Sequence, residues 1–94
     1  MSRAFVNEDA PGGDAPRYPL PLPEDPAYDL AAARALLRGA DEGDSASAEA
    51  ATGYVFGEPK LRTQVERILA EARADGNERL EQLAERFLRV SYQP

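Results

Sequence analysis

Apolar residues recur at helical spacing in the last third of the chain. Between residues 61 and 72 they fall at i, i+4, i+7, i+8 and i+11, and between residues 80 and 88 at i, i+3, i+4, i+7 and i+8. This spacing places apolar side chains on one face of an amphipathic helix. The two faces comprise Leu61, Val65, Ile68, Leu69 and Ala72, then Leu80, Leu83, Ala84, Phe87 and Leu88. The pattern predicts two consecutive amphipathic helices.

A short link joins these two helices. Pro59 is expected in the opening turn of the first helix, Gly76 is expected to end it, and Asn77 to cap the second. Two amphipathic helices joined so closely are expected to fold back on each other as an antiparallel hairpin. Residues 90–94 continue no clear pattern and are expected to fray.

Alanine and leucine dominate residues 30–37, which predicts a helix nearer the N-terminus because alanine has the highest intrinsic helix propensity. Asp25 is expected as its N-cap, and Pro26 suits the first helical position. Gly39 is expected to end the helix in a left-handed conformation.

A shorter helix is predicted over residues 45–52. Asp44 or Ser45 can cap it, and Gly53 can end it. Its apolar side is formed by alanines alone, so it can approach a neighbour closely but buries little area. The Tyr-Val-Phe run at 54–56 is too short for a sheet of its own and is expected to plug one end of the helical core.

Together these elements predict an all-α fold. We expect a small antiparallel helical bundle of three main helices and one short helix, with an extended proline-rich N-terminal arm. Residues 1–24 are assigned to the arm, 25–90 to the helical domain and 91–94 to a C-terminal tail. The 94 residues fit one domain.

The arm is defined by proline. Five of the eight prolines lie within residues 7–24, where they exclude a helix or a central strand. The Pro-Leu-Pro-Leu-Pro run at 19–23 predicts polyproline II structure. One interpretation is a spacer. The other is a segment that straps across the domain or docks on a partner, with Leu20 and Leu22 directed into a groove.

Composition removes several classes of function. The chain has no cysteine and no histidine, which excludes disulfides, thiolate sites and the commonest general base. The formal net charge is −6, and an acidic middle over residues 25–57 argues against direct nucleic-acid binding. No apolar run approaches the length of a membrane span, and residues 1–10 do not resemble a signal peptide. We therefore expect a cytoplasmic protein without a cofactor.

An acidic turn offers the first candidate site. Asp41, Glu42 and Asp44 suit contact with a basic protein surface or a divalent cation. The turn is too short for a calcium loop, so no metal site is predicted, and the alternative is a solvated turn that caps a helix. The nearby hydroxyl residues lack a histidine base, so no catalytic residue is predicted.

The N-terminal nonapeptide, residues 1–9, offers the second candidate site. Its order is basic, then apolar, then acidic. Phe5 and Val6 can anchor a short docking motif, and Arg3 can pair with a carboxylate of the partner. The alternative is a tail in which two apolar residues occur by chance.

The same segment carries a family resemblance. MSRAFVNEDA, followed by a proline-rich spacer, Tyr28 and a helix, resembles the N-terminus of bacterial GreA/GreB-like transcription elongation factors. The resemblance implies contact with RNA polymerase, and Gly43-Asp44 could correspond to the acidic tip that reaches the polymerase's catalytic Mg²⁺. Ser47 stands where the family has its tip glutamate, and no segment matches the family's C-terminal domain. Transcript cleavage is therefore not expected.

Three functional hypotheses follow. The first is a non-enzymatic protein-interaction module, an accessory or regulator of bacterial RNA polymerase. The second is a small helical-repeat-like adaptor that associates with itself or another helical protein through the exposed side of the last two helices. The third, least favoured, is a Mg²⁺-dependent enzyme at the acidic turn. The oligomeric state is left open.

Overall fold

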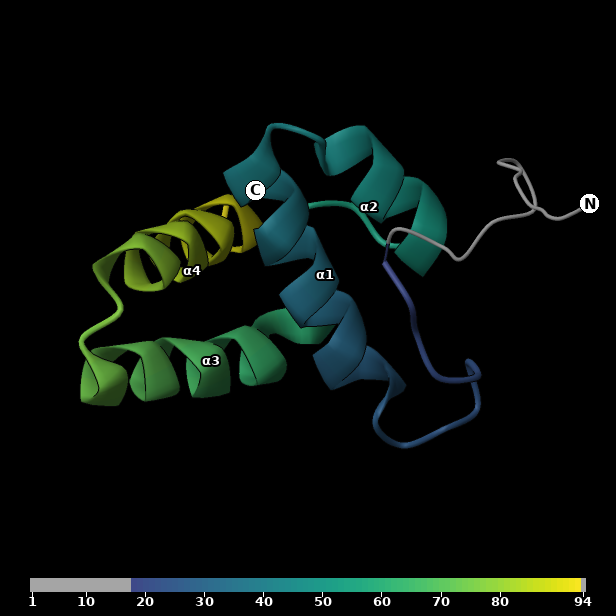
Figure 1. Ribbon diagram of the computed structural model, residues 1–94, viewed down its shortest axis with the longest axis horizontal. Helices are drawn as coiled ribbons and strands as arrows, with labels where there is room; N and C mark the ends of the chain where they lie inside the picture. Colours follow the sequence, from purple (N-terminus) through teal and green to yellow (C-terminus); the bar gives the residue numbers. More distant parts are fainter. Residues whose placement is uncertain (1–17, 94) are drawn as a thin grey trace, which may run out of the picture.

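The computed structural model describes residues 18–93, and within them the fold is built from helices alone. The elements are α1 (Tyr28–Glu42), α2 (Ser45–Thr52), the 3-10 turn η1 (Pro59–Leu61), α3 (Arg62–Asp75) and α4 (Glu78–Ser91). α3 and α4 form an antiparallel hairpin, α1 packs across both, and α2 packs against α1 (Figure 1). The predicted all-α fold of three main helices and one short helix is confirmed. No helix in the described range is long and apolar enough to span a membrane.

The α3–α4 hairpin follows the apolar pattern closely. All five residues of the first predicted face are buried, as are Leu83, Ala84 and Phe87 of the second. Leu80 and Leu88 are partly buried at the edge of this core. Asn77 caps α4 as expected, because its side-chain oxygen accepts a hydrogen bond from the Leu80 N–H at 3.1 Å.

The boundaries of α1 differ from the prediction at both ends. The carboxylate of Asp25 accepts the N–H of Ala27 at 2.8 Å, which makes a turn ahead of the helix rather than its cap. The helix then continues through Gly39 and ends at Gly43, which adopts a left-handed φ of 73°. Gly39 has another role, since a Cβ there would lie only 2.7 Å from the Cβ of Ala48. It lets α2 approach α1 closely.

The predicted bounds of α2 are confirmed, with Gly53 after its last residue, and Asp44 takes the N-cap position without a side-chain capping hydrogen bond. The apolar plug is confirmed in part. Tyr54 and Phe56 are partly buried and pack on the core, and the Phe56 ring meets the Phe87 ring edge-on with centroids 5.0 Å apart. Val55, by contrast, is 58% exposed.

The C-terminal end of α4 is held by α3, so the expected fraying is wrong for residues 90–93. Ser91 is buried, and its hydroxyl donates to the Leu88 carbonyl at 2.8 Å. The Arg62 guanidinium lies 3.9 Å from the centroid of the Tyr92 ring and donates to the Ser91 carbonyl.

The described part of the arm, residues 18–24, lies partly on the helical domain. Tyr18 is only 3% exposed, and its hydroxyl donates to Glu42 at 2.8 Å, next to the Arg38 guanidinium. Leu20 packs against the core, whereas Leu22 is 71% exposed. The strap interpretation therefore describes residues 18–20 and does not extend to Leu22.

Candidate functional site

A groove of about 350 Å³ lies between α1 and the beginning of α4. We call it the α1–α4 groove. It is lined by Arg34, Leu37, Arg38, Asp41, Asn77, Arg79, Leu80 and Leu83. The three leucines form an apolar floor, in which Leu37 and Leu83 are buried and Leu80 is partly exposed. Three arginines stand around this floor.

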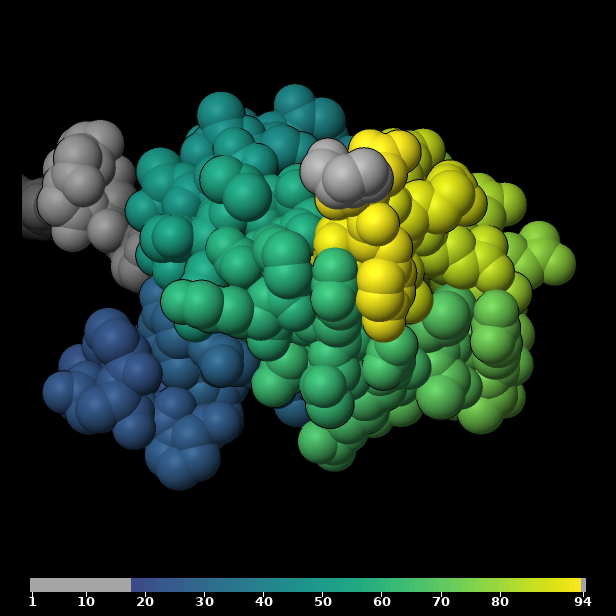
Figure 2. Space-filling model, turned by 180° about the vertical axis from the view of Figure 1, so that it is seen from behind, coloured from purple at the N-terminus to yellow at the C-terminus, as the bar shows by residue number. Residues whose placement is uncertain are grey.

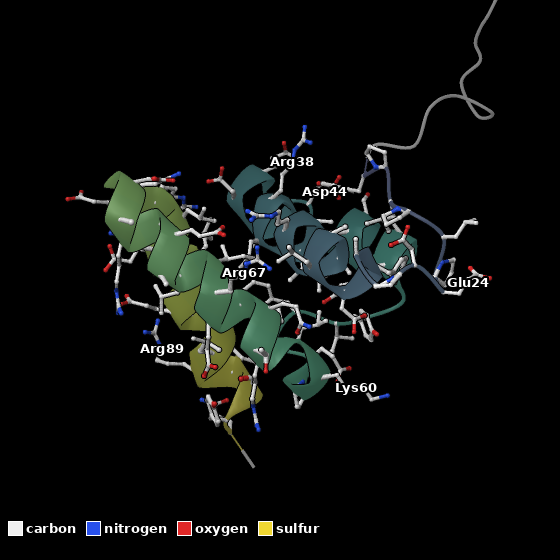
Figure 3. All side chains as sticks on the ribbon, turned by 90° about the horizontal axis from the view of Figure 1, so that it is seen from below. Glu24, Arg38, Asp44, Lys60, Arg67 and Arg89 are labelled. Carbon is white, nitrogen blue, oxygen red and sulfur yellow. The ribbon has the colours of Figure 1, made fainter. Side chains whose placement is uncertain are left out.

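Helix geometry explains why these residues share one groove. On α1 the lining residues are spaced i, i+3, i+4 and i+7, which is one face of the helix. On α4, Leu80 and Leu83 are spaced i and i+3 and directly follow the Asn77 cap. The tight α3–α4 link brings the first turn of α4 beside the last two turns of α1. The arginine on the α1 face that Figure 3 labels, Arg38, projects outward from that helix.

Ion pairs tie the rim together. Arg79 Nε lies 2.7 Å from Asp41 Oδ1 and so joins α4 to α1. Arg34 pairs with Glu71 of α3, also at 2.7 Å. All four of these side chains are roughly half exposed, so each pair contributes little to stability.

Arg38 completes the rim through a pair within its own helix, with Glu42 at 2.9 Å. Each rim pair is made through one guanidinium nitrogen. A guanidinium has five N–H donors, so each rim arginine can bind a further carboxylate without first releasing the one that it already holds.

Glu71 responds to this arrangement. The hydrogen bond from Arg34, helped by the charges of Arg34 and Arg67, holds the pKa of the Glu71 carboxyl below its ordinary value. The carboxylate is thus kept charged beside the groove in mildly acidic solution.

A second hollow adjoins the first. It has a volume of about 240 Å³ and is lined by Tyr18, Pro19, Ala31, Arg34, Ala35 and Arg38. Arg34 and Arg38 line both hollows and form a ridge between them. Tyr18 and Pro19 therefore lie next to the α1–α4 groove, with only the side chains of Arg34 and Arg38 between them and it.

The three carboxylates of the acidic turn make different contacts within the described residues. Asp41 lines the groove and pairs with Arg79, Glu42 accepts hydrogen bonds from Arg38 and Tyr18, and Asp44 takes the N-cap position of α2. Among residues 18–93 no group of three acidic or other metal-ligating side chains is placed to hold a metal ion. Asp41 is thus the carboxylate of this turn that lines the α1–α4 groove.

The remaining predicted site residues divide into those that the structure describes and those that it does not. Arg3, Phe5 and Val6 fall outside the described residues. Leu20 packs on the core of its own domain, and Leu22 is exposed and does not line the α1–α4 groove. Of the predicted site residues within 18–93, Asp41 alone lines the groove.

Sequence reasoning missed most of the groove. Arg34 and Arg38 interrupt an alanine–leucine helix at i and i+4, with Asp41 at i+7, and that polar stripe was a usable signal. Arg79 and Leu80 carried no such signal. Their part in the groove depends on how α4 meets α1, which is a property of the packed helices.

The outer face of α4 carries two shallow hollows that share Glu85. One is lined by Glu78, Glu81, Gln82 and Glu85, and the other by Glu85, Leu88, Arg89, Tyr92 and Gln93. Figure 2 shows the C-terminal end of α4 beside the segment around η1, where Gly57 lies against Val90. Three of the exposed large apolar residues, Val55, Val90 and Tyr92, belong to these two segments.

Comparison with known proteins assigns no family. No family model matches the chain, and no curated protein or solved structure is detectably similar to it. The fold and the groove define a small all-α protein with an arginine-rimmed apolar groove.

Proposed function

We propose that this protein is a non-enzymatic protein-interaction module whose α1–α4 groove binds an apolar side chain flanked by carboxylates. One observation carries the proposal: a floor of three leucines is surrounded by three guanidiniums in a hollow of about 350 Å³. The groove offers hydrogen-bond donors and apolar contact, and its lining contains no pair of a nucleophile and a base.

The energetics fit a modest but specific contact. A hollow of this size is at the small end for ligand sites and has room for one or two large side chains. Burying one leucine or phenylalanine is worth about 1.5–3 kcal/mol. Arginine binds carboxylates in a planar, bidentate geometry and is enriched where binding energy concentrates. The carboxylates would therefore supply orientation, and the apolar side chain would supply most of the affinity.

A peptide titration tests the groove. The probe is a capped peptide with a central leucine between glutamates, added to the ¹⁵N-labelled full chain. We expect shifts at Leu37, Leu80 and Leu83, and weaker binding in Arg79→Glu. Arg86→Glu is the matched control, because Arg86 is an arginine of the same helix outside the groove lining. Equal loss of binding in both variants would reduce the effect to net charge and sink the groove as the site.

The partner proposed on the sequence resemblance is bacterial RNA polymerase. The support is the similarity of residues 1–10 to GreA/GreB-like factors, with Arg3, Phe5 and Val6 as the docking peptide. The test is a pull-down from the host lysate with full-length wild type, Phe5→Ala/Val6→Ala and Leu80→Ser as baits. Point variants are preferable to truncation at Asp25, which would remove the buried Tyr18.

The three baits separate the two elements. Polymerase lost with the double variant assigns contact to the docking peptide, and polymerase lost with Leu80→Ser assigns it to the groove. If no bait recovers polymerase, the transcription proposal is wrong. The peptide titration then remains as the test of the groove.

The outer face of α4 supports a second candidate, the self-associating adaptor. Val90 and Tyr92 are exposed, and Tyr92 lines a hollow together with Leu88. Sedimentation velocity over a hundredfold range of concentration tests it. Self-association that weakens in Val90→Ser supports this candidate, and a monomer throughout the range contradicts it.

A further inference from the structure

The chain itself contains a segment with the chemistry that the α1–α4 groove is proposed to bind. Residues 5–9 read Phe-Val-Asn-Glu-Asp, two apolar side chains followed by two carboxylates after one residue. The groove presents a leucine floor and, on its rim, the guanidiniums of Arg34, Arg38 and Arg79. The two are complementary in both apolar character and charge.

The placement of Tyr18 makes contact within one molecule geometrically easy. Tyr18 is buried beside Arg38, in the hollow that shares Arg34 and Arg38 with the groove. Phe5 lies thirteen positions before Tyr18. Such a length can span up to about 45 Å, whereas α1, with 15 residues, is only about 22 Å long.

We propose that residues 5–9 dock into the α1–α4 groove of their own chain and compete there with the partner segment. This inference rests on the groove proposed above as a binding site. Phe5 and Val6 lie over Leu37, Leu80 and Leu83, and Glu8 and Asp9 pair with rim arginines.

Tethering makes a weak contact effective. A tether of this length gives a local concentration in the millimolar range. A segment with only millimolar affinity as a free peptide is then bound for a large part of the time. A partner must displace it, so the docked segment raises the concentration of partner needed for binding.

The proposal also changes what the N-terminal segment does to partner binding. If Phe5 and Val6 only contact the partner, their replacement weakens the complex. If they occupy the groove, their replacement frees it and strengthens binding of a groove ligand. The sign of the effect distinguishes the two roles.

The first test uses a tryptophan reporter in the full chain. The protein contains no tryptophan, so Phe5→Trp introduces a single fluorophore at the proposed anchor. We expect its emission to be blue-shifted relative to the same chain in denaturant, at every protein concentration. Emission at the fully exposed wavelength would overturn the proposal. A blue shift that grows with concentration would place the segment on a second copy and overturn docking within one chain.

Groove variants locate the contact. In the Phe5→Trp background we expect a red shift with Leu80→Ser and with Arg79→Glu, and none with the controls Leu22→Ser and Arg86→Glu. Arg79→Glu should lower the docking equilibrium constant about two- to fivefold, the range for one exposed ion pair. Circular dichroism will show whether Leu80→Ser folds. If it does not fold, the Arg79→Glu variant still tests the proposal. A blue shift unchanged in Arg79→Glu and in folded Leu80→Ser would overturn the groove as the docking place.

The acidic leucine peptide separates this inference from the function on which it rests. We expect Phe5→Ser/Val6→Ser to bind that peptide more tightly than wild type does. Equal affinity of wild type and variant would overturn self-docking and leave the groove as a binding site. Binding to neither protein would overturn both proposals.

Discussion

The two helical hairpins of this protein are held together in different ways. The α3–α4 hairpin interlocks large side chains, with Val65, Ile68 and Phe87 almost inaccessible to solvent. The α1–α2 pair meets through Gly39 and Ala48, which bring the helices close while burying little apolar area. The hydrophobic effect is enough to hold α3 against α4, whereas α1 and α2 also need specific hydrogen bonds.

Those polar ties lie at the open end of the α1–α2 pair. The Tyr28 hydroxyl donates to the Thr52 carbonyl at 2.8 Å, and the Tyr54 hydroxyl donates to Asp29 at 2.9 Å. The Phe56 N–H donates to the Glu49 carboxylate at 2.9 Å. The first two bonds fix the end of α2 and the following loop against α1, and the third fixes that loop against α2. The comparison teaches that small-residue contact sets the distance between helices and polar bonds set their position.

The largest effect is expected from a substitution in the apolar core of the α3–α4 hairpin. Phe87→Ala removes a fully buried ring that also meets Phe56, so we expect a loss of about 3–5 kcal/mol in the free energy of unfolding. Unfolding curves over a range of denaturant concentrations measure this loss. Val90→Ala, at a position of the same helix that is 42% exposed and lies against Gly57, is the control and should cost much less than Phe87→Ala. Similar losses in both variants would contradict the proposed division of roles.

The next effect tests the close contact between α1 and α2. Gly39→Ala adds a Cβ only 2.7 Å from that of Ala48, and such overpacking costs about 1–3 kcal/mol. The higher helix propensity of alanine offsets up to about 1 kcal/mol of this. We therefore expect a net loss in thermal and chemical denaturation.

A compensating variant isolates the steric cause. Gly39→Ala/Ala48→Gly moves the methyl group from one helix to the other and should recover part of the lost stability. A double variant less stable than both single variants would show that Gly39 matters for a reason other than space.

The contrast between the hairpins also explains what the sequence could predict. Leu61 to Ala72 and Leu80 to Leu88 repeat large apolar residues at helical spacing, so both helices and their antiparallel contact were predictable. Gly39 was misread as a stop because a glycine that ends a helix and a glycine that admits a neighbour look alike in one dimension. Only the position of Ala48 in space separates the two.

The groove was harder to predict than the fold. Its α1 face follows helical spacing, but its α4 side depends on the crossing of two helices distant in sequence. The acidic turn was identified as a candidate because its carboxylates are adjacent in sequence. In the folded chain Asp41 pairs with Arg79 at the groove, whereas Glu42 accepts a hydrogen bond from Tyr18, and neither contact could be read from their adjacency in sequence.

A smaller effect tests the polar ties of the α1–α2 pair. Tyr54→Phe removes the hydrogen bond to Asp29 and should cost about 0.5–1.5 kcal/mol at neutral pH. The same bond, with partial burial, raises the pKa of Tyr54 above its ordinary value of 10.0. A raised folded-state pKa gives stability that is present below pH 10 and lost as pH rises through the folded value. Denaturation at pH 9 and pH 11 should therefore show a steeper loss in wild type than in Tyr54→Phe. Parallel losses would rule out this bond as the cause.

The smallest effect concerns the pair that joins α1 to the apolar hairpin beside the groove. Arg34 lowers the pKa of Glu71, so this carboxylate stabilises the fold above its ordinary pKa of 4.5 and loses that contribution as pH falls through the lower folded value. Both side chains are exposed to solvent, so the effect is best followed by NMR titration of the Glu71 carboxyl carbon. We expect a midpoint below 4.5 in wild type and a return toward 4.5 in Arg34→Ala. Arg86→Ala, which leaves the pair intact, is the control. A midpoint that does not move in Arg34→Ala would mean that Arg34 does not hold Glu71, and that α1 is joined to the hairpin by apolar contact and the Arg79–Asp41 pair alone on this side.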